Sequence, residues 1–296
     1  MVEMTRRGVP GVSTVPSGRR LAGRRFAGKR LAMLTTVAAG VLMAGCLTTS
    51  APKPEANAAT LQAAQLNAAQ QAEASYNYAD AVGIYQGLYQ QNPSDLGLAL
   101  NLARNMRFAG QPQNAISMVS QLIGKQGRTA PLLTELGKAY LAADQDNLAL
   151  PTLLEAKEKA PNDWEILSTL GVAYDYQGNY ADAREAYAQA LIASPSNPAV
   201  LNNLALSQAS SGDLDGAIAT LQQAIDQPTA SAQTRQNLAL LMALKGDPDA
   251  AERLARKDLP PDVADNNNAY FRMISAAAAK NASAPAQASQ PPAAVQ

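Results

Sequence analysis

A 34-residue period runs through the middle of the chain and constrains its fold more than any other feature. Alanine recurs at every step of 34 from Ala81 to Ala251, and leucine recurs in register with it from Leu102 to Leu238. A third series in the same register is glycine with one aspartate: Gly110, Asp144, Gly178, Gly212 and Gly246. Three series that keep register without an insertion predict tandem copies of one structural unit.

Each unit has the pattern of two helices joined by a turn. In residues 164–197, apolar or small residues recur at three- and four-residue spacing before Gly178-Asn179 and again after it. That spacing places them on one face of each helix, and the Gly-Asn pair interrupts the first helix. A single helix hairpin cannot bury its own apolar face, so the units must stack on one another. We therefore expect an all-α solenoid.

This length and pattern resemble the tetratricopeptide repeat (TPR). The resemblance covers six units, at 62–95, 96–129, 130–163, 164–197, 198–231 and 232–265. The outer two units depart from the pattern. Tyr76 replaces the turn glycine in the first, and Arg235 stands in the last where the middle units have leucine. Such departures are expected at the ends of a solenoid, because an end unit has a neighbour on one side only.

The composition excludes several classes of active site. The chain has no histidine and one cysteine, Cys46, which removes Ser-His-Asp and Cys-His catalysis, His/Cys zinc sites and an internal disulfide. Carboxylates are scattered over positions expected to face solvent, which favours ordinary helix charge over a catalytic pair. We therefore predict a protein that is not an enzyme and that uses no cofactor or metal. The hypothesis of an enzyme with a helical body is the one that this composition supports least.

The net charge of zero conceals an uneven distribution. Residues 1–45 carry eight Lys or Arg and one acidic residue, which leaves 16 basic and 23 acidic residues in the remainder of the chain. A mildly acidic body gives no support to nucleic-acid binding.

The amino-terminal segment has the pattern of an export signal. The basic stretch is followed by an apolar run at 31–45, which is too short for a comfortable membrane-spanning helix of about 20 residues. The residues Met43-Ala44-Gly45-Cys46 resemble the lipobox of bacterial lipoproteins. That resemblance implies cleavage after residue 45, diacylglyceryl modification of Cys46 and stable anchoring by acyl chains. The basic stretch is long for a signal, so we also consider translation from Met4.

Two alternatives for Cys46 stay open: a free thiol in an uncleaved anchor, and an incidental cysteine behind an ordinary signal. Paired arginines also raise twin-arginine export, although Phe26-Ala27-Gly28 fit that motif poorly and favour the general secretory route. Leu47, and not aspartate, follows the cysteine, which resembles the pattern of bacterial lipoproteins that are sorted to the outer membrane. We therefore expect a protein of the bacterial cell envelope that is anchored in the outer membrane and faces the periplasm. We expect a flexible tether at 46–61, a capping helix at 266–280 and a disordered Ala/Pro/Gln-rich tail at 281–296.

The TPR resemblance also implies a concave groove lined by the first helix of each unit. Arg104, Arg107 and Lys138 would form a basic patch in it, suited to an acidic segment or a C-terminal carboxylate of a partner. Recurrent asparagines would bond a peptide backbone with both donor and acceptor groups. The predicted partner-binding residues are Asn101, Arg104, Arg107, Lys138, Asp175, Asn202, Asn203 and Asn237.

A lipid anchor, a tether and six TPR units resemble the TPR lipoprotein of tight-adherence (Flp) pilus assembly, the TadD kind, and more distantly the pilotins of type IV pili. The resemblance implies a scaffold that helps a secretin to reach or assemble in the outer membrane. The alternative is a periplasmic TPR adaptor lipoprotein that docks proteases or peptidoglycan hydrolases. Either function would rest on protein–protein interaction.

Overall fold

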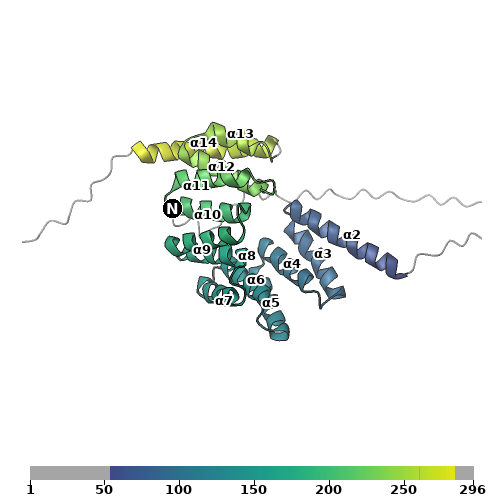
Figure 1. The fold of residues 1–296 in the computed structure, drawn as a ribbon. Coiled ribbons are helices and arrows are strands. Elements are labelled where there is room, and N and C mark those ends of the chain that lie inside the picture. Colours follow the sequence, from purple (N-terminus) through teal and green to yellow (C-terminus); the bar gives the residue numbers. More distant parts are fainter. Residues whose placement is uncertain (1–53, 260, 284–296) are drawn as a thin grey trace, which may run out of the picture.

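The computed structural model describes residues 54–259 and 261–283, and every regular element in these residues is an α-helix. The helices form six antiparallel hairpins followed by one long helix (Figure 1). The first helix of each hairpin is called the opening helix here, and the second the closing helix. In order, they are α2 (Pro54–Ala74), α3 (Tyr78–Gln91), α4 (Leu96–Phe108), α5 (Pro112–Gln126), α6 (Ala130–Ala142), α7 (Asp146–Lys159), α8 (Trp164–Tyr176), α9 (Tyr180–Ala193), α10 (Pro198–Ser210), α11 (Leu214–Ile225), α12 (Ala232–Lys245), α13 (Pro248–Ala255) and α14 (Pro261–Ser283).

The predicted 34-residue register is confirmed. The opening helices α4, α6, α8, α10 and α12 begin at residues 96, 130, 164, 198 and 232. The turn residue at each step has a positive φ, from 55° at Asp144 to 101° at Gly246, and Tyr76 adopts φ 57° at the same place in the first unit. Glycine suits this position because a left-handed backbone crowds the Cβ of other residues.

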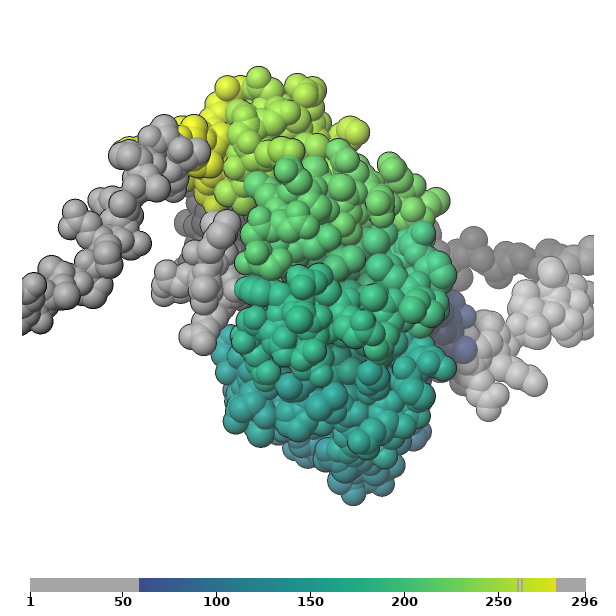
Figure 2. All heavy atoms as spheres, turned by 60° about the vertical axis from the view of Figure 1, so that its left-hand side comes forward, coloured from purple at the N-terminus to yellow at the C-terminus, as the bar shows by residue number. Residues whose placement is uncertain are grey.

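The core follows the same period. The alanine at each step from Ala81 to Ala251 is fully buried. Each opening helix packs against its own closing helix, and α4, α6, α8, α10 and α12 also contact one another in sequence. The units therefore stack in one direction as a continuous body (Figure 2). The all-α solenoid expected from the repeats is confirmed.

Close packing within a unit is illustrated by Gly171 on α8 and Tyr187 on α9. A Cβ at Gly171 would lie 2.5 Å from Cε1 of Tyr187, which is itself fully buried. Glycine is therefore required here by the neighbouring ring, since the helix itself would favour alanine.

The solenoid curves, so that the end of α2 lies near the start of α12 (Figure 1). Arg235 on α12 binds Asp258, with 2.6 Å between Nη2 and Oδ1. Asp258 raises the pKa of the Arg235 guanidinium, and the nearby phenol of Tyr76 adds to that rise. The arginine in the last unit, which departed from the repeat pattern, therefore has a structural partner.

The first helix is longer than expected. α2 begins at Pro54, so residues 54–61 of the predicted tether are helical. Proline is tolerated in the first turn of a helix because that turn needs no backbone N–H donor. Residues 1–53 lie outside the described part, and with them the predicted signal peptide, the lipobox and Cys46. None of the described helices combines the length and the apolarity that crossing a bilayer requires.

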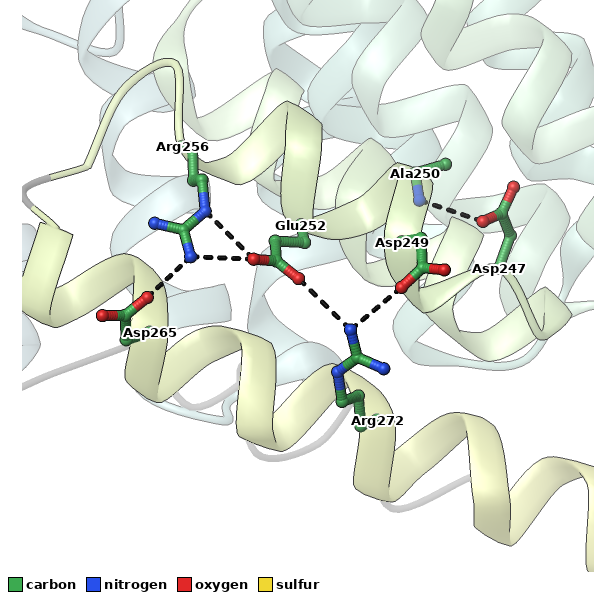
Figure 3. Close-up of polar contacts among 7 residues, drawn as sticks. All are labelled: Asp247, Asp249, Ala250, Glu252, Arg256, Asp265 and Arg272. Carbon is green, nitrogen blue, oxygen red and sulfur yellow. Dashed lines mark hydrogen bonds and ion pairs between the residues drawn. The ribbon is translucent and has the colours of Figure 1, made fainter.

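The predicted capping helix is present as α14, which extends beyond both expected ends and packs on α12 and α13. Phe271 is buried against the last core cluster, and Ser275 Oγ donates a hydrogen bond of 2.6 Å to the carbonyl of Ala243. An ion network also joins α13 to α14: Arg256 bridges Glu252 and Asp265, and Arg272 bridges Asp249 and Glu252 (Figure 3). Residues 281–283 of the predicted disordered tail are part of α14, which contradicts the prediction there, and residues 284–296 lie outside the described part of the chain.

Candidate partner-binding groove

The opening helices hold one row of side chains in a fixed register. Several of them begin after a capping residue, whose side chain accepts a hydrogen bond from a backbone N–H of the first turn. Asp95 accepts from Leu98 N at 3.0 Å, Asp163 from Glu165 N at 2.8 Å and Asn197 from Ala199 N at 3.0 Å. Because these helices start at equivalent residues, equivalent side chains face the next unit. We call the side chains that lie between or beside successive opening helices the inner row.

The predicted basic patch is largely neutralised within the protein. Arg107 Nε donates to Glu135 Oε1 at 2.8 Å, and both side chains are nearly buried. Lys138 forms an ion pair with Glu165 of the next unit. Arg104 is exposed and makes no ion pair with any described residue. Two cations of the predicted basic patch are therefore paired within the protein, and Arg104 is the member that forms no ion pair with a described residue.

The three cations nevertheless gather around Glu165. Burial opposes ionisation of this carboxyl, but Lys138 outweighs that effect, and Arg104 and Arg107 add to it, so that the pKa of Glu165 is lowered. The charges of all three cations therefore act on this one carboxylate, although Lys138 is the one that forms an ion pair with it.

A half-buried acid that accepts two hydrogen bonds occurs twice in the inner row. Glu73 accepts from Tyr85 Oη at 3.3 Å and from Asn105 Nδ2 at 2.5 Å. Asp175 accepts from Tyr187 Oη at 2.7 Å and from Ser207 Oγ at 2.6 Å. Each member of the second set lies 102 residues, or three repeat lengths, after its counterpart. In both sets the acid joins its own unit to the next one.

Asp175 is therefore engaged in the structure and is not free for a partner. Burial raises the pKa of this carboxyl, and the hydrogen bonds from Ser207 and Tyr187 oppose the rise without cancelling it. Burial also raises the pKa of the Tyr187 phenol well above its ordinary value, and the neighbouring Asp175 adds to that effect. Neutral donors around a half-buried carboxylate satisfy its oxygens but supply no positive charge.

The predicted asparagines form a ladder between units 4, 5 and 6. Asn203 Nδ2 donates to Ser168 Oγ at 3.1 Å, and Asn237 Nδ2 donates to Asn202 Oδ1 at 2.8 Å. Both bonds join residues 35 apart, so the same contact is repeated at the next step. Asn101 differs in that its backbone carbonyl accepts a hydrogen bond from the side chain of Asn105 on the same helix. These amides hold the opening helices together, and the Asn202 side chain both accepts from Asn237 and donates to Asn203 Oδ1 at 3.5 Å.

Sequence reasoning missed the acids, amide and hydroxyl that complete these contacts, namely Glu73, Asn105, Glu135 and Ser207. Their signal is spacing: the contacts between units join residues 27 to 35 apart, close to one repeat length. A complementary pair at that spacing on successive opening helices is therefore a candidate contact between units.

One position of the inner row changes character along the solenoid. At steps of 34 it is Gln70, Arg104, Lys138, Val172, Leu206 and Leu240. The last three are half-buried, so part of each side chain faces outward. This position is thus polar or basic in units 1 to 3 and apolar in units 4 to 6. Such an arrangement suits a peptide with an acidic residue near one end and apolar residues along the rest.

The described residues contain no cluster of three or more His, Cys, Asp or Glu that would hold a metal ion.

Comparisons with known proteins identify the repeat. A family model described as a tetratricopeptide repeat matches residues 168–233. The general transcriptional corepressor ssn6 of Schizosaccharomyces pombe is 26% identical over 113 residues, which is 38% of this chain and 10% of that protein. The chain thus spans about a tenth of the length of this curated relative.

Solved structures of other repeat proteins are similar in fold. A thermophilic TPR protein of Thermus thermophilus is similar with a TM-score of 0.55 and 23% identity, over 61% of this chain and 98% of that chain. A structure reported in a functional characterization of Pseudomonas aeruginosa pilF has a TM-score of 0.46 and 17% identity, over 71% of this chain and 97% of that chain. The Thermus structure supports the fold alone.

Proposed function

Since the chain folds as a tetratricopeptide-repeat solenoid, we propose that it is a lipid-anchored scaffold of the bacterial cell envelope that binds a protein partner in its inner row. Solenoids of this kind typically act through extended surfaces and not through catalysis. The anchor is the acylated Cys46 implied by the sequence Met43-Ala44-Gly45-Cys46. The proposed location is the outer membrane, facing the periplasm.

The observation that carries this function is the uncompensated Arg104 in a row whose other cations are paired. Arg107 and Lys138 bind Glu135 and Glu165, so Arg104 alone among them can attract a partner's carboxylate. Val172 and Leu206 continue the row as partly exposed apolar residues. The proposed partner segment therefore carries an acidic residue that meets Arg104 and apolar residues that follow the row towards unit 6.

The more specific proposal is assembly of a tight-adherence pilus. It rests on the layout of the chain, with a lipobox and short linker followed by TPR units, which resembles the assembly lipoprotein of that system. In this proposal the partner is a secretin or another pilus-assembly component, and the scaffold helps it to reach or assemble in the outer membrane.

Cross-linking in the envelope, purification of the tagged full chain and mass spectrometry test the proposal. We expect a secretin or pilus-assembly component to be enriched, and Arg104→Glu to reduce its recovery. Arg184→Glu is the matched control, because Arg184 is an exposed helix cation on α9 without an ion pair in the described residues. Hydrolases or proteases without a secretin would contradict the pilus proposal and favour the adaptor alternative. Equal recovery with both variants would contradict the role of Arg104.

The anchor is tested separately. Cys46→Ser should leave the body folded and release it from the membrane fraction, because acyl chains contribute about 0.8 kcal/mol per buried methylene to membrane binding. A variant that still sediments with membranes would show that the chain is held by an uncleaved segment or by another protein.

A further inference from the structure

A second surface lies on the closing-helix side of the last two units, away from the inner row. A groove with a volume of about 320 Å³ runs between α11 and α13, over α12. Its lining consists of Gln222, Ile225, Leu238, Met242, Ala250, Arg253, Leu254 and Lys257. This volume is at the lower end of the range for binding pockets, and the open form suits side chains of a docked segment more than an enclosed small molecule.

The floor of the groove is apolar. Leu238 and Leu254 are buried members of the last core cluster, and Ile225 and Met242 pack on that cluster while remaining half-exposed. A methionine at a partly exposed site adapts to different apolar partners because it is unbranched and polarisable. The groove therefore offers apolar area to a partner without requiring the core to open.

The charges on α13 and the residues directly after it are divided between two sides. Towards α14, Asp249, Glu252 and Arg256 are all engaged in the ion network shown in Figure 3. Towards the groove, Arg253 and Lys257 are exposed, lie four residues apart and make no ion pair with any described residue. The described lining contains no carboxylate. The groove thus carries uncompensated positive charge on a body that is acidic as a whole.

We propose that this groove docks a short acidic amphipathic helix of a partner protein. Apolar side chains on one face of that helix would cover Ile225 and Met242, and carboxylates beside them would meet Arg253 and Lys257. An amphipathic helix fits because apolar and charged groups at three- and four-residue spacing match a groove bordered by two helices. The proposal is independent of the inner row, since the two surfaces share no residue.

Two helical probe peptides test the charge requirement. Both carry the same leucine face over about four helical turns, one flanked by glutamates and the other by lysines. Binding to the full chain in detergent is followed by fluorescence anisotropy at low and high salt. We expect the glutamate probe to bind the unaltered protein about tenfold more tightly than the lysine probe, and the difference to shrink at high salt.

Charge reversal provides the decisive comparison. Arg253→Glu with Lys257→Glu should invert the preference, so that the lysine probe binds more tightly, while Arg184→Glu leaves both affinities unchanged. Replacing the leucines of the glutamate probe by serine should abolish its binding. Hydrogen exchange should show protection confined to α11, α12 and α13 when the glutamate probe is bound. Circular dichroism checks that the variants remain helical.

Several outcomes would overturn the proposal. Equal affinity for the two probes, or no binding by either, would show that the groove does not select acidic helices. Protection confined to α4, α6 and α8 would place the binding at the inner row instead. Binding to anionic vesicles that depends on Arg253 and Lys257, without binding of the glutamate probe, would identify a membrane contact in place of a protein partner. The proposed function is tested separately with the Arg104 variant, so failure of the groove proposal leaves it unaffected.

Discussion

The contact between Gly171 and Tyr187 makes a quantitative prediction about core packing. Gly171→Ala should gain up to about 1 kcal/mol from the higher helix propensity of alanine. The new methyl group would lie 2.5 Å from the ring of a fully buried tyrosine, so the ring or the helix must move. Overpacking of this kind costs about 1–3 kcal/mol, and a buried ring places the cost near the upper end. The net expectation is a loss of about 2 kcal/mol.

Gly83→Ala is the matched control. Gly83 is also in a helix interior, but a Cβ built there meets nothing within 4 Å. This substitution should therefore stabilise the protein by up to about 1 kcal/mol. The two variants should differ by about 3 kcal/mol, or about 6–12 °C in Tm for a body of this size. Thermal melts followed by circular dichroism, with urea unfolding as a second measure, give the comparison.

Another repeat unit shows which pair of residues would relieve the clash. Ala103 and Val119 occupy the equivalent positions of unit 2, so Gly171→Ala with Tyr187→Val copies a pair that already packs in the same fold. The double variant should be less destabilised than the sum of the two single variants, since neighbouring residues couple by about 0.5–3 kcal/mol. A Gly171→Ala protein that melts above the unaltered one would refute the argument, as would strict additivity in the double variant.

Three other predictions concern the core and the inner row. Asp175→Asn should leave the free energy of unfolding at pH 7 unchanged or higher. Burial raises the folded-state pKa of this carboxyl above its ordinary value of 3.8. The carboxyl therefore contributes its full stability below its unfolded pKa and loses that contribution as pH rises through its folded pKa. Urea unfolding across this pH range measures the effect, and a loss above about 1.5 kcal/mol at pH 7 would contradict the argument. Arg107→Ala should cost about 3 kcal/mol by leaving Glu135 buried and unpaired, and adding Glu135→Gln should recover part of it in the same assay. Ala183→Leu should cost about 1–3 kcal/mol because Ala183 is fully buried at a helix crossing, and an unchanged Tm would count against the register.

The fold was predictable because the residues that determine it are the periodic ones. Small residues such as Ala183 and Gly171 set how closely two helices approach, and Gly178 sets the turn between them. These requirements are local and identical in each unit, so they are visible as a repeat in a single sequence. A position that must be small, or must have a positive φ, in one unit has the same requirement in the next. The opening helices of the middle units accordingly begin at the first residue of each unit defined from the repeat.

The ends of the described body were less predictable. The segment around Pro54 contains proline and small polar residues, which predicted a tether, yet Pro54 stands at the start of α2. Composition alone does not separate a linker from a helix start when proline is tolerated at both. α14 likewise extends beyond the expected helix, because its Ala-rich second half has high helix propensity but no periodic partner that would reveal its length.

The charge state of the inner row was the least predictable feature. Sequence position alone placed Arg104, Arg107 and Lys138 close together, and the pKa of Glu165 reflects all three. Whether each of these three cations forms an ion pair depends on the side chain that faces it from the next unit. The ion pairs do not follow the 34-residue period, so the repeat does not reveal them. Arg107 forms a nearly buried ion pair with Glu135, whereas Arg104, one helical turn away, acts on Glu165 only through its charge and forms no ion pair with a described residue.

Cations that form ion pairs within the protein stabilise the fold, whereas unpaired cations can bind a partner. Removing the cation of a buried pair leaves the carboxylate buried without a partner, so Arg107 is required for the stability of the solenoid. No ion pair with a described carboxylate would be lost on replacing Arg104, Arg253 or Lys257. Each replacement should therefore change the free energy of unfolding by no more than about 0.5 kcal/mol. Neither the repeat nor its stability explains why these positions are basic. Their charge is available to partners, and it marks the two separate surfaces of the solenoid where binding should be sought.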